Sequence, residues 1–412
     1  MRGRHLVAVL CALLAVVLTV SACGSSSDDS SSSTSTGAST GGAASGNKDP
    51  ITIGATFGLT GPMSFYDQPM VQGIEAAIKD VNARGGIDGR PVRLITNDNQ
   101  SDVNKLVQSA RDMIAKRPTL LLTSSSNTTG GPAARVANAA GQLTMGAAGN
   151  TIYGKTGGGE LVFNDWHGDP TEAAALAQFA DRKGYDSVYI AEDLALDYTQ
   201  DVCRYFRTAY RGRIVGEVRY NSSTDQSFNS QVTQIRSAAP EARAIVICGL
   251  TTGGPTLIKQ LRSAGVDNPV IGTGGGMDGD FWARAVPNLG EFYSDSVASV
   301  YGDDPDPARN ELVARITRET GRVPPTGHIF IAYSVVEMLK KAIEDSGGKT
   351  DAATLQKAYE SFRDVPTIAG TTTYTADCHV PIGRTLAITE IVDGRGRFVE
   401  AIKPADVPRA IC

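Results

Sequence analysis

From residue 51 onward, short apolar runs alternate with stretches in which apolar residues recur at helical spacing. The runs at residues 51–57, 92–97 and 119–123 are rich in β-branched residues and predict strands. Between them, helical periodicity predicts helices over residues 70–81 and 103–114, and a Gly-Gly pair ends the first of these. Strands that alternate with helices in this way form a parallel sheet covered on both faces.

The same rhythm starts again near residue 171. The predicted strands of this second array are residues 187–191, 214–220, 243–248 and 269–273. The predicted helices are residues 171–183, 197–210, 227–238 and 255–264. Two α/β arrays in a chain this long predict two lobes, with more chain left after residue 302. In such open sheets a ligand binds beyond the carboxyl ends of the strands.

The first 48 residues differ in character from the rest. Residues 1–22 combine a basic start, a short apolar run and small residues, which is typical of a secretory signal. The tetrad that ends in Cys23 resembles a bacterial lipobox, so we expect Cys23 to be acylated; the alternative is an ordinary signal peptide with a chance cysteine. Residues 23–48 are nearly all small and polar, which predicts a flexible Ser/Gly tether. We therefore expect an exported protein, lipid-anchored to the outer face of the cytoplasmic membrane.

Charge and cysteine content narrow the choice of partners. Removing the signal shifts the net charge from −5 to −7, and no strongly basic segment suggests nucleic acid. Four cysteines then remain besides Cys23, and an even number outside the cytoplasm favours disulfides. Of the three possible pairings we favour Cys203–Cys248 and Cys378–Cys412, because each pair lies within one stretch of chain. With three histidines left and no close Cys/His spacing, we expect no metal site and no cofactor.

The stretch GNTIYGKT, residues 149–156, fits the phosphate-loop pattern G-x-x-x-x-G-K-[ST]. Such a loop needs its lysine and hydroxyl residue to open a helix, and the three glycines after Thr156 disfavour a helix start. An exported protein is also separated from cytoplasmic ATP. We therefore expect no ATP binding here, with Lys155 and Thr156 at the surface and Gly149 at the lip of a cleft. An enzyme is a rival class, but the one G-x-S-x-G match, GASTG at residues 37–41, lies in the predicted tether and not at the strand-to-helix turn of a nucleophile elbow.

Three stretches carry a family resemblance: ITIGATFGLTGPMSFYDQ, GIEAAIKDVNARGGIDGRPVRLITNDNQSD and QLRSAG. They resemble the leucine/isoleucine/valine-binding family, which are periplasmic-binding-protein type I solute receptors of ABC importers. The alternative is an unrelated pair of flavodoxin-like domains. The resemblance implies two Rossmann-like or flavodoxin-like lobes joined by a three-strand hinge. Lobe one would be residues 49–169 plus 303–374, and lobe two residues 170–302 plus 375–412.

The resemblance also implies a function without catalysis. A small solute would bind in the cleft between the lobes and stabilise a closed form, which ABC permease and ATPase subunits would recognise. We expect a monomer. A ligand-sensing module of the same fold, partnered with a membrane signalling protein, is the alternative.

Carried over residue by residue, the resemblance suggests a set of ligand contacts. Tyr66 would face the ligand side chain, and the loop at residues 125–127 would hold a carboxylate. Gly274 stands where amino-acid binders carry a glutamate for the ligand ammonium; Asp278 could compensate. The ligand-binding candidates are Tyr66, Ser125, Ser126, Asn127, Ala148, Asn150, Trp166, Tyr198, Thr251, Gly274 and Asp278. Because the ammonium-binding acid is replaced, we expect a small polar organic solute: an amino acid, an amide or urea-like compound, or an organic acid.

Overall fold

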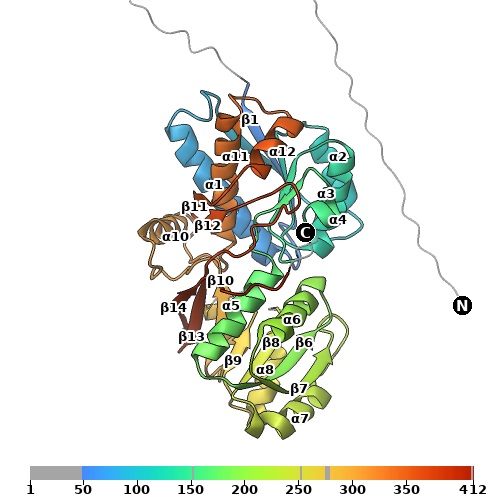
Figure 1. Ribbon diagram of the computed structural model, residues 1–412, viewed down its shortest axis with the longest axis vertical. Helices are drawn as coiled ribbons and strands as arrows, with labels where there is room; N and C mark the ends of the chain where they lie inside the picture. Colours follow the sequence, from blue (N-terminus) through green and yellow to red (C-terminus); the bar gives the residue numbers. More distant parts are fainter. Residues whose placement is uncertain (1–48, 151–152, 251–252, 274–278, 410–411) are drawn as a thin grey trace, which may run out of the picture. The chain divides into compact units, whose positions relative to one another are not determined.

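The structure is a computed structural model that describes residues 49–150, 153–250, 253–273, 279–409 and 412. Over these residues the first sheet has five parallel strands in the order β2-β1-β3-β4-β5. Figure 1 labels its strand β1. Its strands are β1 (Ile51–Phe57), β2 (Val92–Asp98), β3 (Leu120–Thr123), β4 (Thr144–Gly146) and β5 (Val162–Asn164). All seven residues of β1 are buried, as expected of a central parallel strand covered on both faces.

Helices pack on both faces of this first sheet. One face carries α1 (Ser64–Ala83), α10 (Pro307–Thr320), α11 (His328–Asp345) and α12 (Ala352–Glu360). The other carries α2 (Leu106–Ile114) and α3 (Asn127–Ala139). Alternate residues of β3 point to opposite cores, since Leu120 and Leu122 pack with α1 and α11 while Leu121 packs with α2 and α3. Three helices from the later part of the chain thus complete the first lobe.

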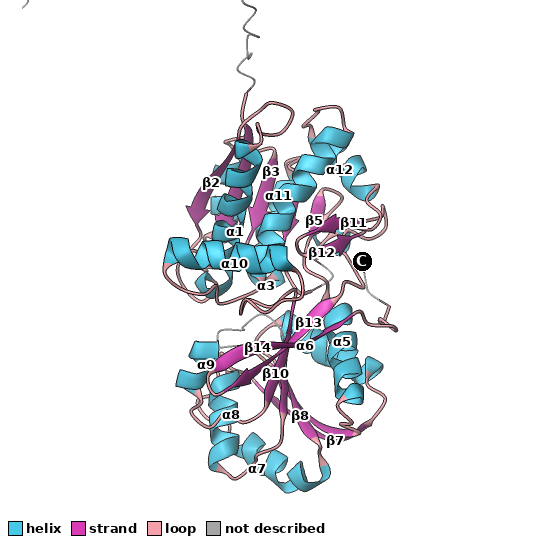
Figure 2. Ribbon diagram, turned by 90° about the vertical axis from the view of Figure 1, so that its left-hand side faces the viewer, coloured by secondary structure: helices cyan, strands magenta, loops and turns pink. Residues whose placement is uncertain are grey.

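The second sheet has seven strands in the order β14-β13-β10-β9-β8-β6-β7 within the described part of the chain. Its parallel strands are β6 (Ser187–Asp193), β7 (Arg213–Tyr220), β8 (Ala244–Cys248), β9 (Val270–Gly272) and β10 (Phe292–Ser296). The hairpin β13 (Leu386–Val392) and β14 (Arg395–Ile402) joins antiparallel at the β10 edge. One face is covered by α5 (Asp169–Arg182) and α6 (Asp197–Ala209), and the other by α7 (Asn229–Ala238), α8 (Gly254–Ser263) and α9 (Gly279–Ala285) (Figure 2).

The two-lobed α/β fold with parallel sheets is confirmed. Each strand and helix predicted from periodicity is present, with ends that differ by a few residues. One local expectation was wrong: despite its glycines, the chain forms a one-turn helix, α4 (Lys155–Gly158). Lys155 there donates to Ala376 O at 2.7 Å and pairs with Glu160 at 2.9 Å, so its ammonium is held by protein groups.

Three segments run between the two sheets, at residues 165–168, 297–306 and 373–385. The first and third are joined by a buried ion pair, in which Arg384 Nη2 lies 2.5 Å from Asp165 Oδ1. Arg384 also donates to the Asp165 carbonyl at 2.6 Å, and Tyr374 donates its hydroxyl to Asn164 O at 3.0 Å. Burying an unpaired charge is unfavourable in free energy. The ion pair therefore holds the first and third crossing segments together.

Both favoured disulfides are present. Cys203–Cys248 ties α6 to the interior strand β8, and Cys378–Cys412 ties the third crossing segment to the last residue. Among the described residues there is no helix with the length and apolarity required to cross a bilayer. The predicted signal, tether and acylated Cys23 lie outside the described residues.

Asp80 links three helices of the first lobe and should make their packing sensitive to pH. It accepts from Arg315 Nη1 of α10 and from the Tyr333 hydroxyl of α11, both at 2.7 Å. Partial burial opposes ionisation, but these hydrogen bonds outweigh it and lower the pKa of Asp80. A lowered pKa in the folded state stabilises the fold above the unfolded pKa of about 4, and that contribution is lost as the pH falls through the folded pKa.

We therefore expect Asp80→Asn to lower the free energy of unfolding at pH 7, by an amount that shrinks toward zero below about pH 3. Urea unfolding of both proteins between pH 3 and 7 measures this difference. An equal loss at every pH would contradict the ionic role.

Candidate functional site

A pocket lies where the carboxyl ends of the two sheets face each other. Its lining comes from the loops after β1, β3, β4, β5, β6 and β8 and from the starts of α1, α6 and α11. The lining residues are Met63, Tyr66, Ser125, Ser126, Ala147, Gly149, Trp166, Leu196, Tyr198, Leu250 and His328. The cavity has a volume of about 40 Å³, far below the roughly 300 Å³ or more of typical organic-ligand pockets. A solute would therefore bind only if the walls first move apart.

A buried carboxylate positions one wall of this pocket. Asp67 Oδ2 accepts from Gly58 N at 2.7 Å and from Ser124 Oγ at 2.6 Å, while Oδ1 accepts from Ser125 N at 2.9 Å. Burial raises the pKa of Asp67, and the hydrogen bonds from Ser124, Ser125 and Gly58 counteract that effect. Asp67 thereby joins the loop after β1 to the loop after β3, next to Tyr66 and Ser126.

Several buried polar atoms face this region without a hydrogen-bond partner in the described structure. They are Ser125 Oγ, Ser126 Oγ, Trp166 Nε1 and His328 Nδ1. Ser126 is also the N-cap of α3, whose first backbone N–H groups favour an anion. Since buried polar groups are normally paired, these atoms mark where a ligand would supply the missing partners.

Aromatic rings form a second wall. His328 stacks on Trp166 with ring centroids 4.6 Å apart and lies 5.5 Å from the ring of Tyr66. Burial lowers the pKa of His328 to about 3, so its imidazole is neutral at physiological pH. This wall is therefore flat, uncharged and mostly apolar.

A buried acid lies just behind the lining of the pocket. Asp169, at the start of α5, is fully buried, and neither of its carboxylate oxygens has a hydrogen-bond partner among the described residues. It lies directly behind Gly149, where an added Cβ would sit 2.7 Å from Asp169 Oδ1 and collide with the ring of Tyr198. Burial, with the nearby Glu172 next in importance, raises the pKa of Asp169 well above its usual value. Burial thus favours the uncharged form of Asp169, and a cation beside it would stabilise the ionised form.

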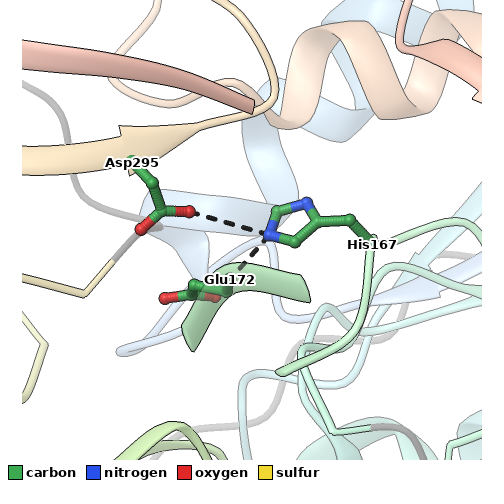
Figure 3. Close-up of side chains that lie close together, drawn as sticks. All are labelled: His167, Glu172 and Asp295. Carbon is green, nitrogen blue, oxygen red and sulfur yellow. Dashed lines mark ion pairs between the residues drawn. The ribbon is translucent and has the colours of Figure 1, made fainter. Parts of the chain in front are cut away.

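Next to Asp169 is a cluster of three buried side chains from three elements. Its members are His167 in the first crossing segment, Glu172 on α5 and Asp295 on β10 (Figure 3). Nε2 of His167 lies 3.6 Å from Glu172 Oε2 and 3.7 Å from Asp295 Oδ2. Tyr198, which lines the pocket, donates its hydroxyl to Glu172 Oε1 at 2.6 Å. Within the described residues, these three side chains form a group whose imidazole nitrogen and carboxylate oxygens are atom types that bind metal ions.

The structure brings five of the predicted ligand contacts together on the lining: Tyr66, Ser125, Ser126, Trp166 and Tyr198. Three others lie off the lining. Ala148 exchanges backbone hydrogen bonds with the side chain of Asn164. Asn127 donates to Asp197 at 2.7 Å, and Asn150 donates to Asp201 at 2.6 Å, so both amides bind α6 instead. Thr251, Gly274 and Asp278 lie outside the described residues.

Several residues of the site were not among the predicted contacts. His328 follows a turn and starts an apolar helix, which gave no sign that it would reach the pocket. Asp67 and Asp169 are acids near helix starts, a common position for solvated residues. Their complete burial is the informative feature, and it depends on the packing of distant segments.

The profile of the family described as "Periplasmic binding protein" matches residues 50–396. A Leu/Ile/Val-binding protein homolog of Brucella melitensis is 27% identical over 330 residues, covering 79% of this chain and 87% of the relative. The Leu/Ile/Val-binding protein BraC3 of Rhizobium johnstonii is 25% identical over 332 residues, again covering 79% and 87%.

Solved structures share the fold. The branched-chain amino acid transporter substrate-binding protein LivJ of Streptococcus pneumoniae, in complex with isoleucine, superposes with a TM-score of 0.73 at 21% identity. That match covers 86% of this chain and all of LivJ. A leucine-binding protein, LivK, of Thermotoga maritima gives 0.74 at 19% identity and covers 86% and 99%.

Replacing Asp67 should loosen the wall that it holds. In Asp67→Asn one carboxylate oxygen becomes an NH₂ group, which leaves a buried N–H without an acceptor, at a cost of about 1–3 kcal/mol. We expect the free energy of unfolding in urea to fall by that amount. Asp98→Asn is the control, because Asp98 also binds the loop after β1 but through more exposed hydrogen bonds. A loss in Asp67→Asn no larger than in this control would contradict the positioning role.

Proposed function

Because this chain belongs to the periplasmic binding protein family, a family of solute-binding proteins rather than enzymes, we propose that it captures an α-amino acid with an apolar side chain. The observation that carries this proposal is the pairing, around one pocket, of an anion-binding loop with an unpartnered buried carboxylate. An α-amino acid presents a carboxylate and an ammonium group on one carbon atom. Neither an organic acid nor a urea-like compound has both.

The carboxylate would bind at the loop after β3. Ser125 Oγ and Ser126 Oγ are buried without partners, and α3 begins directly after Ser126. Hydroxyl groups and the positive end of a helix both stabilise an anion there. Asp67 keeps this loop in place by accepting the N–H of Ser125.

The ammonium would bind at Asp169. An ion pair formed in a site without water is worth far more than one at the surface, and a carboxylate buried without a partner is unfavourable. A ligand cation would relieve that penalty. The glutamate that Gly274 replaces in amino-acid binders would then be substituted by an acid from another element, the first residue of α5.

The side chain of the solute would lie against the remaining lining. Met63, Leu196 and Leu250 supply aliphatic contacts, and the stacked rings of Trp166 and His328 supply a flat face. Such a surface favours an aliphatic or aromatic side chain over a charged one. The leucine and isoleucine of the related structures fit this description.

Capture would end in closure and delivery to an ABC importer. Asn127 and Thr128 bind Asp197 at 2.7 and 2.8 Å, and Asn150 binds Asp201 at 2.6 Å, which connects the loops of the first sheet to α6 of the second lobe. Ligand contacts made only in the closed form would shift the population toward it. An acylated Cys23 and the tether at residues 23–48 would hold the protein beside its permease. A sensor that reports the same closure is the second candidate.

Binding tests the amino-acid assignment directly. We expect leucine, isoleucine or valine to raise the melting temperature of the purified protein, by mass action. 4-Methylpentanoate, which is leucine without its ammonium group, should not. An equal shift with both compounds would rule out an ammonium site.

Substitution of Asp169 should change affinity far more than stability. In Asp169→Asn we expect affinity for the amino acid to fall about 10- to 100-fold by titration calorimetry, since a charge-assisted hydrogen bond is lost. The same change should leave the stability of the unliganded protein nearly unchanged, because burial already favours the uncharged acid and neither the acid nor the amide finds a hydrogen-bond partner among the described residues. Glu337→Gln replaces another partly buried acid, remote from the lining, and serves as the matched control. Unchanged affinity in Asp169→Asn would contradict the assignment.

A further inference from the structure

A second site lies next to the solute pocket, at the start of the second lobe. We propose that His167, Glu172 and Asp295 bind one divalent zinc ion through one imidazole nitrogen and two carboxylate oxygens. This site is independent of the solute proposal, because none of the three residues lines the pocket. It departs from the sequence-based expectation of no metal, which rested on spacing alone.

The ligand atoms converge although they come from three elements. The side chains of all three residues are fully buried. Nε2 of His167 faces Glu172 Oε2 at 3.6 Å and Asp295 Oδ2 at 3.7 Å, as the dashed lines in Figure 3 show. Both separations are longer than a normal hydrogen bond and lie in the range of an ion pair, so the imidazole nitrogen faces both carboxylates at once.

The separations suit a metal bridge. Two ligand atoms about 2.0–2.1 Å from zinc at the tetrahedral angle lie roughly 3.3–3.4 Å apart. Octahedral neighbours at a magnesium-like distance would lie only about 3 Å apart. Shifts of a few tenths of an ångström would bring each carboxylate oxygen to the tetrahedral separation from His167 Nε2. The three ligand atoms lie within 4.8 Å of one another, so closure of the gap between the two carboxylates would complete three positions of a tetrahedral zinc site. The mixed nitrogen and oxygen ligands are also within the set that zinc accepts.

His167 gives the independent sign that a ligand belongs here. Neither Nδ1 nor Nε2 has a hydrogen-bond partner in the described structure, although the side chain is fully buried. Its ring is fixed by packing on Trp166, with centroids 4.4 Å apart. A buried imidazole that uses neither nitrogen is unusual, and a metal bond at Nε2 would satisfy the one that faces both carboxylates.

Neighbouring residues orient the two carboxylates so that each turns an oxygen toward His167, as the ligands of a metal site must. Tyr198 donates to Glu172 Oε1 and so leaves Oε2 turned toward His167. Asp295 is held in register on β10 by β13, opposite Ile388. The neighbouring arginine, Arg384, is bound to Asp165 rather than to this cluster. Such supporting contacts typically change metal affinity by 10- to 100-fold.

A metal here would join the first crossing segment to α5 and β10. Because His167 precedes that helix and packs on Trp166, the ion would also steady one wall of the pocket. The expected signature is zinc binding at a stoichiometry of one per chain, with a higher melting temperature in zinc than in chelator.

The test is titration of the purified full-length protein with zinc after treatment with a chelator. We expect calorimetry and elemental analysis to give one zinc per chain. Affinity should fall at least about tenfold in both Glu172→Gln and Asp295→Asn, which keep side-chain size. X-ray absorption should show nitrogen and oxygen ligands without sulfur, which excludes the cysteines. Glu360→Gln removes the carboxylate from a different buried histidine pair, His379–Glu360 at 3.2 Å, and should leave zinc affinity unchanged.

Two results would overturn the proposal: no zinc bound by the wild-type protein, or equal affinity in Glu172→Gln, Asp295→Asn and Glu360→Gln. Circular dichroism confirms that each variant is folded. Titration of the same samples with leucine measures solute binding separately, so a failure to bind zinc can be told apart from a failure to bind the amino acid.

Discussion

Buried acidic side chains need partners, and this need determines the contacts of the segment where the chain first passes between the lobes. Asp165, Asp169 and Glu172 are all fully buried within eight residues of chain. Each would cost several kcal/mol if left ionised without a partner. Asp165 is met by Arg384, and Glu172 accepts from Tyr198. Asp169 has no such partner within the described protein, so a proton or a cation from outside would have to neutralise its charge.

This constraint links the hinge to the pocket. The Asp165–Arg384 pair fixes the first crossing segment, whose Trp166 forms a pocket wall and whose His167 enters the acidic cluster. On the other side, Asp67 fixes the loop that carries Ser125 and Ser126. Two buried carboxylates thus fix the arrangement of groups within each of two walls, although the walls must still move apart for a solute to enter. In the proposed function the solute would pair with the unsatisfied atoms of both walls, and a poorly matched solute would leave those atoms unpaired.

Much of the fold was predictable because local pattern and global packing agree. The runs that became β1, β6 and β8 are apolar on both faces, which only a covered parallel sheet permits. Both disulfides followed from pairing cysteines within a stretch of chain. The one-turn helix α4 was not predicted because glycine propensity is a weak guide where flanking contacts fix the backbone.

The candidate site was predictable only in part. Ser125 and Ser126 follow β3 almost directly, and Tyr66 lies in the first turn of the helix after β1, so topology alone brings them to the pocket. Asn127 and Asn150 also follow strands, yet acids on α6 bind their amides, and no local pattern reveals a partner from the other lobe. Asp169 and His328 gain their roles from burial between segments far apart in the sequence. Contacts of that kind are set by tertiary packing rather than by periodicity.

The central claim is that the solute supplies the cation that Asp169 lacks. A crystal structure of the protein with leucine bound tests it most directly. The account predicts the ammonium nitrogen about 3 Å from a carboxylate oxygen of Asp169, with the solute carboxylate at the hydroxyls of Ser125 and Ser126. An ammonium group placed against another acid, with Asp169 still without a partner, would contradict it.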